Sequence, residues 1–224
     1  SRGMRRSMKR GNWEKAFDGA KMKRTVFTTV MASLLGVLCG CSNSQPAALT
    51  RKPEGKILIV CYSESANQNT MTAAKWIQQQ VGGDLCAVKM VTPYSGSYRK
   101  VLKESKAHLD NDIKPEILPL GKNAADYDIV FVGSPVWYGT FAPPLGTFFS
   151  QNDLSGKTVI PFCTHGGGGA GHLFDDVAKA VPKSKVLPGL TLKGSNVIER
   201  ALGRGTASKA SPDEVVKWLN EIFH

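Results

Sequence analysis

The sequence is poor in the residues from which metal sites and disulfide frameworks are built. It has five cysteines, an odd number with no CxxC pair, and its four histidines are scattered. This spacing gives no zinc-site pattern. Cys61, Cys86 and Cys163 lie in apolar strand-like runs, where cysteine is usually a small buried hydrophobic residue. We therefore predict no metal site and no catalytic thiol.

The net positive charge of the chain is small outside the first 24 residues. The formal net charge is +11, but residues 1–24 hold nine Lys and Arg against two acidic residues, so the rest of the chain carries only +4. A body so mildly basic lacks the clustered positive charge of a nucleic-acid-binding surface. Hydrophobic residues make up 42% of the chain, which is typical of a globular protein. The composition predicts a globular domain that does not bind nucleic acid.

Residues 22–41 have the pattern of a secretory leader. Lys23 and Arg24 precede a largely apolar run over residues 25–38, which is short for a membrane span and typical of a signal peptide. The run ends in LCGC, which resembles the lipobox of bacterial lipoproteins. That resemblance implies lipidation of Cys41, the first mature residue, and a lipid-anchored protein at the membrane of a bacterial cell envelope. An ordinary cleaved leader is the alternative.

The sequence predicts three segments: a leader over residues 1–41, a flexible tether over residues 42–55 and one folded domain over residues 56–224. The tether is polar, has two prolines and shows no periodicity. In the domain, apolar runs alternate with amphipathic stretches. Strands are expected at 56–62, 84–91, 128–134, 157–163 and 185–192, and helices at 71–82, 93–110, 145–153, 171–181 and 211–223.

This alternation predicts an α/β fold, a doubly wound, five-stranded parallel sheet with helices on both faces. The fifth strand is weak because Pro188 and Gly189 interrupt it. The last helix has a capping-box spacing, with Ser211 as the N-cap and Glu214 three residues later.

Polar residues fill the loop between the first strand and the first helix. Backbone N–H groups and the positive end of the helix dipole meet at such a point and make it a ready anion site. Simple helix capping by Asn or Ser is the alternative reading. The candidate residues are Ser63, Ser65, Ala66, Asn67, Asn69 and Thr70.

Two more loops follow the third and fourth strands. In an open parallel sheet, ligands bind outside the carboxyl ends of the strands. Adjacent aromatic rings suit a flat π system, and glycine allows close backbone approach, although packing and simple flexibility are the alternatives. A strand order of 2-1-3-4-5 would bring all three loops together. The candidates are Pro135, Val136, Trp137, Tyr138 and Gly139 in one loop, and Thr164, His165, Gly166, Gly167, Gly168 and Gly169 in the other.

These pieces, in this order, resemble the flavodoxin family, in particular its bacterial branch with a THGG-type third loop. The matching pieces are KILIVCYS…NT, PYSGSY, DYDIVFVGSPVWYGTFAPPLGTFF and LSGKTVIPFCTHGGGGAGH. The resemblance implies a three-layer flavodoxin-like domain that binds FMN. The first loop would hold the phosphate, Trp137 and Tyr138 would cover the isoalloxazine, and residues 164–169 would line its polar edge. The first loop lacks the glycine usual in the family, with Ala66 nearest to its position.

Three functions remain open. The first is electron transfer through FMN to redox partner proteins, with no covalent catalysis and no catalytic residue. The second is an FMN-dependent NAD(P)H or quinone oxidoreductase, favoured by THGGGG and His165. That histidine would hydrogen-bond the flavin ring or a quinone, or merely cap the next helix. The third is a binding module that kept the fold without the flavin.

Overall fold

The computed structural model describes residues 48–65, 67–194 and 210–224. Three predictions therefore lie outside the described residues: the leader over residues 1–41, the lipidation of Cys41 and the role of Ala66. Within the described ranges, no helix is long and apolar enough to cross a membrane.

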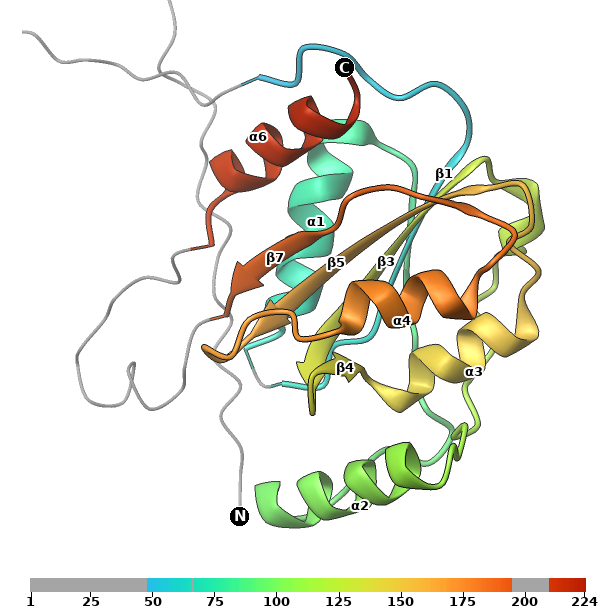
Figure 1. Ribbon diagram of the computed structural model, residues 1–224, viewed down its shortest axis with the longest axis vertical. Coiled ribbons are helices and arrows are strands. Elements are labelled where there is room, and N and C mark those ends of the chain that lie inside the picture. Colours follow the sequence, from blue (N-terminus) through green and yellow to red (C-terminus); the bar gives the residue numbers. More distant parts are fainter. Residues whose placement is uncertain (1–47, 66, 195–209) are drawn as a thin grey trace, which may run out of the picture. The chain divides into compact units, whose positions relative to one another are not determined.

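The sheet has seven strands rather than the predicted five (Figure 1). Five of them lie side by side in the predicted order 2-1-3-4-5. These five are β2-β1-β3-β5-β6, all in parallel. The additional strands are short: β4 pairs antiparallel with β3, and β7 pairs parallel with β5. The strands are β1 (Ile57–Cys61), β2 (Asp84–Ala87), β3 (Ile129–Trp137), β4 (Thr140–Phe141), β5 (Thr158–His165), β6 (Lys185–Val186) and β7 (Leu190–Lys193).

The predicted fifth strand is divided into β6 and β7 at the interruption noted in the sequence. Proline has no N–H to donate to a sheet ladder. The carbonyl of Pro188 instead accepts a hydrogen bond from the Trp218 indole N–H at 3.0 Å. A Cβ at Gly189 would lie 2.4 Å from the Phe174 ring, so this residue packs beneath an aromatic side chain. Both halves remain paired with β5.

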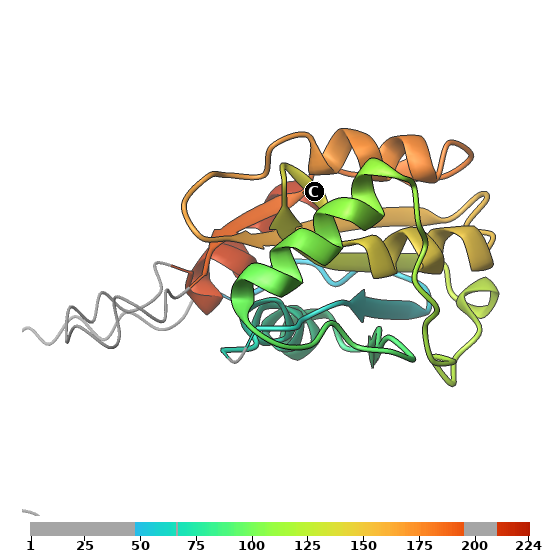
Figure 2. The same cartoon turned by 90° about the horizontal axis from the view of Figure 1, so that it is seen from below.

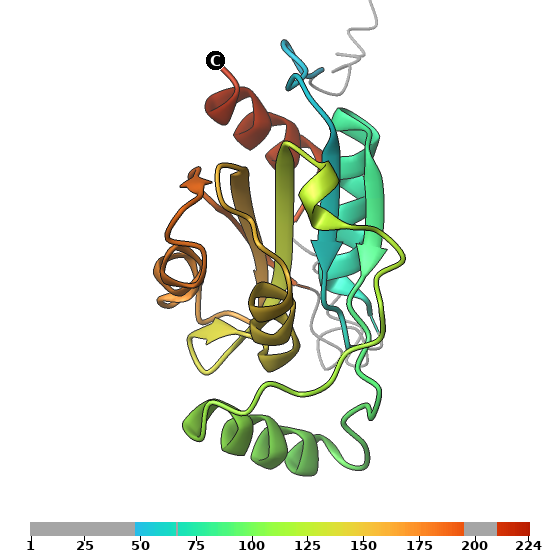
Figure 3. The same cartoon turned by 90° about the vertical axis from the view of Figure 1, so that its right-hand side faces the viewer.

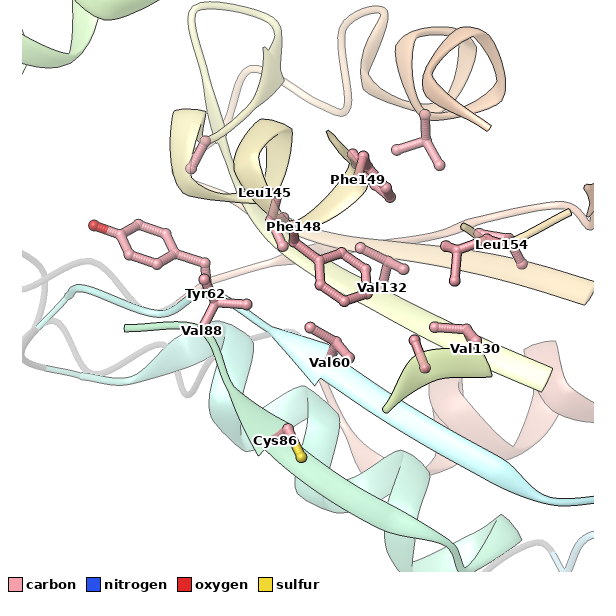
Figure 4. Close-up of a cluster of buried hydrophobic side chains, with 14 of the residues drawn as sticks. Val60, Tyr62, Cys86, Val88, Val130, Val132, Leu145, Phe148, Phe149 and Leu154 are labelled. Atoms are coloured by element: carbon pink, nitrogen blue, oxygen red, sulfur yellow. The ribbon is translucent and has the colours of Figure 1, made fainter. Parts of the chain in front are cut away.

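Helices cover both faces of the sheet, as the three-layer prediction requires (Figure 2). Side chains at alternate strand positions, such as Ile57 and Ile59, pack with α1 and α6, whereas Leu58 and Val60 pack on the α3 and α4 side. Figure 4 shows the second of these clusters, in which Phe148 lies against Val132. The helices are α1 (Asn69–Val81), α2 (Tyr98–Asp110), α3 (Pro143–Gln151), α4 (Leu173–Ala180) and α6 (Pro212–Ile222), with a 3₁₀ turn η1 (Ala124–Asp126).

The helix α2 lies across the carboxyl ends of the strands rather than on a sheet face (Figure 3). It begins at Tyr98, at the end of the PYSGSY segment after which residues 93–110 were expected to continue as a helix. Its apolar residues Val101, Leu102 and Leu109 are only half-buried. This position places α2 next to the edge at which the candidate loops meet.

The last helix confirms the predicted capping box. The Ser211 hydroxyl accepts from the Glu214 N–H at 3.3 Å, and the Glu214 carboxylate accepts from the Ser211 N–H at 2.9 Å. Each bond satisfies a backbone or side-chain group that the start of a helix otherwise leaves unpaired.

The described part of the segment predicted as a flexible tether is docked on α6. The backbone N–H and the hydroxyl of Thr50 both donate to the Asn220 side-chain oxygen, at 2.8 and 2.7 Å. Leu49 packs against the core beneath α1 and α6. These contacts involve a residue 170 positions away, so local composition does not reveal them.

Candidate functional site

The first loop, residues 63–68, is folded around the side chain of Gln68. This residue is the N-cap of α1 and adopts a left-handed conformation with φ 48°. Its side-chain amide donates to the carbonyls of Ser63 at 3.3 Å and Ser65 at 2.9 Å. Gln68 thus adopts a conformation that glycine takes most readily, and its side-chain bonds to the loop support it there.

One hydroxyl in this loop is buried without a partner. Among the described residues, the Oγ of Ser63 is the buried side-chain oxygen that makes no hydrogen bond. Leaving such a group unsatisfied costs about 1–3 kcal/mol, and native structures rarely tolerate it without a reason. The hydroxyl is available to a bound acceptor, which is the chemistry that a phosphate oxygen provides.

The N-terminus of α1 also suits an anion. Gln68 makes no side-chain cap to the helix, and the first turn holds no acidic residue. The first turn of α1 thus holds no carboxylate at the positive end of the helix dipole. Together with Ser63, this end of α1 fits a phosphate group.

A buried contact joins the first loop to the third. The hydroxyls of Thr70 and Thr164 are 2.8 Å apart, and both residues are buried. Asn69 lies near the end of β7, where a Cβ added to Gly194 would come within 2.6 Å of the Asn69 amide nitrogen. Both Thr70 and Asn69 were predicted to hold a phosphate, and the structure gives each a neighbour from β5 or β7 as well.

The segment predicted as the second loop forms a β-hairpin. The strand β3 continues through Pro135 and Val136 to Trp137, which pairs with Thr140 of β4. The two turn residues, Tyr138 and Gly139, have φ values of 51° and 83°, as a type I′ turn requires. Gly139 suits the second position of this turn, but Tyr138 is not a residue that type I′ turns favour at the first position, so the local signal is weak.

The two aromatic residues of the hairpin face different neighbours. Trp137 packs edge-on to Tyr62, with ring centroids 5.8 Å apart, and at 5.5 Å from Tyr94. Tyr138 is 46% exposed and donates its hydroxyl to the Leu102 carbonyl of α2 at 2.8 Å. Trp137 therefore belongs to an aromatic cluster, whereas Tyr138 holds α2 at the edge of the sheet.

Sequence reasoning missed Tyr62 and Tyr94 as parts of this cluster. The Tyr62 hydroxyl donates to the Glu64 carboxylate at 2.9 Å, and the Tyr94 hydroxyl lies 2.9 Å from His108 Nδ1. Burial is the main cause that raises the pKa of both tyrosines. They come from separate loops, so no spacing in the sequence brings them together.

The third loop is organised by His165. Its Nδ1 accepts hydrogen bonds from the N–H groups of Gly167 and Gly169, both at 3.0 Å. Burial, with a smaller contribution from Lys193, lowers the pKa of His165, which favours the neutral ring. Because Nδ1 accepts, the proton of that neutral ring resides on Nε2. The N-cap of the next helix is His172, so the capping alternative for His165 is wrong.

The glycine loop is open on its outer side. A Cβ added at any of the four consecutive glycines, residues 166–169, would meet no atom within 4 Å. Gly166 and Gly168 do not have a positive φ either, so neither the backbone nor the protein's own packing requires glycine there. A flat ligand that approaches the backbone closely does require it.

The cysteines of the described residues are inert, as predicted. Cys61, Cys86 and Cys163 are free and buried. Burial raises the pKa of Cys61 to about 12 and that of Cys163 to about 11, so neither forms a thiolate near neutral pH. The described residues hold no group of three His, Cys, Asp or Glu residues suited to a metal ion.

The cavities of about 510 and 610 Å³ lie away from the three loops, whereas that of about 450 Å³ touches the hairpin through β4. This last cavity is lined by α2, β4, α3 and α4, and it includes Thr140 and Asp176.

The chain is similar in sequence and fold to known proteins. Residues 56–204 match the sequence model of a family described as Flavodoxin, whereas no curated protein matches the chain. A presumed flavoprotein from Bacteroides eggerthii is 26% identical, with a TM-score of 0.61 over 75% of this chain and 98% of its own. One from Bacteroides uniformis is 23% identical, with the same TM-score over 75% and 99%. A Lactobacillus acidophilus flavoprotein, solved in complex with FMN, is 21% identical, with a TM-score of 0.55 over 67% and 98%.

Proposed function

The chain belongs to the flavodoxin family, and on that premise we propose that it binds FMN at its three loops and transfers electrons to redox partners. The observation that carries the proposal is the buried, unpartnered hydroxyl of Ser63, near the N-terminus of a helix whose first turn holds no acidic residue. A phosphate at that point satisfies both features. The open glycine loop, residues 166–169, provides the second part of the site.

The residues of the site divide into three roles. Ser63, Ser65 and the N-terminal N–H groups of α1 bind the phosphate. Trp137 and Tyr138 border the flavin, and residues 164–169 line its polar edge. Bound FMN supplies one- or two-electron transfer, and the protein sets its orientation and hydrogen bonding. His165 holds the glycine loop through Nδ1 and leaves its Nε2 proton as a fixed donor.

The Ser63→Ala variant tests the proposal. Removing an unsatisfied buried hydroxyl leaves the flavin-free protein at least as stable as the wild type, while FMN affinity falls roughly ten-fold. Fluorescence quenching during FMN titration measures the affinity, and urea unfolding measures the stability. Ser150→Ala, a serine of α3 outside the loops, is the matched control and leaves FMN affinity unchanged.

Two results would contradict parts of this proposal. Wild-type protein that shows no quenching of FMN fluorescence favours a binding module without flavin. Equal affinity in wild type and Ser63→Ala would remove Ser63 from the phosphate site.

A second candidate function is that of an FMN-dependent NAD(P)H or quinone oxidoreductase. It is favoured by His165, whose neutral ring is fixed by two backbone N–H groups and carries its proton on Nε2. Such a donor suits the carbonyl oxygen of a quinone. Steady-state oxidation of NAD(P)H in the presence of a quinone, absent in His165→Ala, supports this function. A loaded protein that fails to oxidise NAD(P)H would contradict it.

We also propose that Cys41 is lipidated and anchors the protein in a bacterial cell envelope. The support is the charged, apolar and LCGC pattern of residues 23–41. Cys41→Ser should then release the protein from the membrane fraction, as a fractionation blot can measure. Unchanged membrane association would rule out the anchor.

A further inference from the structure

The hairpin that carries Trp137 and Tyr138 is too short to hold its own shape. The strand β4 has two residues, and only the pairs Val136–Phe141 and Trp137–Thr140 join it to β3. Isolated two-stranded hairpins are marginally stable at best. Tyr138 also adopts a left-handed backbone, which costs about 1–2 kcal/mol for a residue with a side chain. Contacts from another element must therefore fix this turn.

The segment leading into α4 provides backbone contacts to the turn. The N–H of His172 donates to the carbonyl of Gly139 at 2.8 Å. A Cβ at Gly171 would lie only 2.4 Å from the same carbonyl oxygen. The end of the glycine loop and the hairpin turn are thus in direct contact.

Side chains reinforce this contact. The Oδ2 atom of Asp176 accepts from the Thr140 hydroxyl at 2.6 Å and pairs with His172 Nδ1 at 2.5 Å. The Lys179 ammonium pairs with the other carboxylate oxygen at 3.1 Å. The carboxylate is only 22% exposed. Burial raises the pKa of Asp176, but the donors from Thr140, Lys179 and His172 outweigh it and leave the pKa below its ordinary value. We call Thr140, His172 and Asp176 the α4 latch.

We propose that the α4 latch positions the hairpin and the glycine loop for the flavin, so that Thr140 and Asp176 control FMN binding through the turn at residues 138–139. This inference rests on the proposed function. Thr140 follows the turn directly, and His172 follows the glycine loop. One carboxylate therefore joins two of the three loops, and a change at Asp176 moves both together.

The Thr140→Val variant tests the latch because it keeps the shape of the side chain and removes its hydroxyl. Hydrogen bonds to a charged group are among the stronger ones in proteins, so FMN affinity is expected to fall about ten-fold. The circular dichroism of the bound flavin should change too, since the orientation of the site differs. Asp176→Asn is the second variant and should act in the same direction.

Amide hydrogen exchange of the flavin-free protein gives a readout that does not depend on FMN. The His172 N–H is protected in the wild type by its bond to Gly139 and should exchange at least several-fold faster in Thr140→Val. Lys179→Ala is the matched control. Its side chain is 76% exposed and contacts the opposite oxygen of the same carboxylate, so both exchange and FMN affinity should stay near wild-type values.

Amide exchange at His172 and FMN affinity together distinguish the ways in which the proposal can fail. Unchanged exchange at His172 in Thr140→Val overturns the latch. Faster exchange with unchanged FMN affinity overturns the positioning role, because the latch then serves stability alone. A wild-type protein that binds no FMN overturns the proposed function and, with it, the positioning role, whichever way the exchange experiment turns out.

Discussion

Gly156 and Gly171 share a backbone conformation but differ in their surroundings. Their φ values are 75° and 60°. A Cβ at Gly156 would meet no atom within 4 Å, whereas one at Gly171 would lie 2.4 Å from the Gly139 carbonyl oxygen. The two positions therefore separate the free-energy cost of a left-handed backbone from that of a close approach.

We expect Gly156→Ala to lower the free energy of unfolding by about 1 kcal/mol, the cost of placing alanine in a left-handed conformation. Gly171→Ala should lose about 3 kcal/mol or more, because the Gly139 backbone must also move. Urea unfolding of both variants measures the difference. Equal losses would mean that Gly139 and Gly171 are not packed together.

For single residues, the sequence predicted which side chains belong to the site. It did not predict which of their polar atoms are already hydrogen-bonded within the protein. It predicted Thr70 and His165 as site residues, yet Thr70 is bonded to Thr164, and His165 Nδ1 accepts from two glycine N–H groups. Gln68 was not predicted to matter, although it closes the first loop. Such bonds depend on the final backbone path, which residue types alone do not specify.

Among the helices in the described part of the chain, α2 buries its apolar side chains least. Its residues Val101, Leu102 and Leu109 are half-buried, whereas α1 fully buries Ala73, Ala74 and Ile77, among others. The hydroxyls of Tyr94 and Tyr138 provide its described polar contacts with the rest of the domain. Weak apolar packing makes local opening easy.

Backbone amides in the middle of α2 are therefore expected to exchange with solvent roughly ten-fold faster or more than those of α1, after correction for intrinsic rates. Hydrogen-exchange mass spectrometry of peptides from the two helices measures this. Tyr138→Phe should widen the gap, because it removes the hydroxyl that donates to the Leu102 carbonyl. Similar protection of both helices would contradict the weak docking of α2.

Elements set by local signals were predictable, and those set by distant contacts were not. The capping box of α6 and the break between β6 and β7 follow from Ser211, Glu214 and Pro188, which act on their own backbone. The position of α2 depends instead on a bond between Tyr138 and Leu102, 36 residues apart. The hairpin of β3 and β4 was not predicted, because Trp137 and Tyr138 were interpreted as aromatic residues of a ligand-binding loop and Gly139 alone is a weak turn signal.

Over the whole molecule, several buried weak acids keep their protons in the folded state. Burial raises the pKa of Cys61 to about 12 and that of Cys163 to about 11, against an ordinary value of 9.0. The bond from Tyr127 to the Asp84 carboxylate raises the pKa of Tyr127 to about 12, against 10.0. Above these ordinary values the unfolded chain loses protons that the folded chain retains.

The free energy of unfolding should therefore be constant near neutral pH and fall as pH rises above about 9 towards 12. The sign follows because the unfolded state binds fewer protons there. Urea unfolding between neutral pH and about pH 10.5 measures the slope. Tyr127→Phe removes one titrating group, so its slope should be smaller than that of the wild type. A free energy of unfolding that rises with pH in this range would contradict the assignment.

The chain enters the domain at the end of the sheet opposite the three loops. Residues 52–56 lead into the amino end of β1, and Thr50 is bonded to Asn220 on α6, whereas the loops follow the carboxyl ends of β1, β3 and β5 (Figure 1). The five residues of β1 alone separate these ends by about 17 Å. A protein coupled to an electrode through Ala48 therefore presents its loops to the electrolyte rather than to the metal. In that geometry, dissolved molecules can reach the loops without passing the point of attachment.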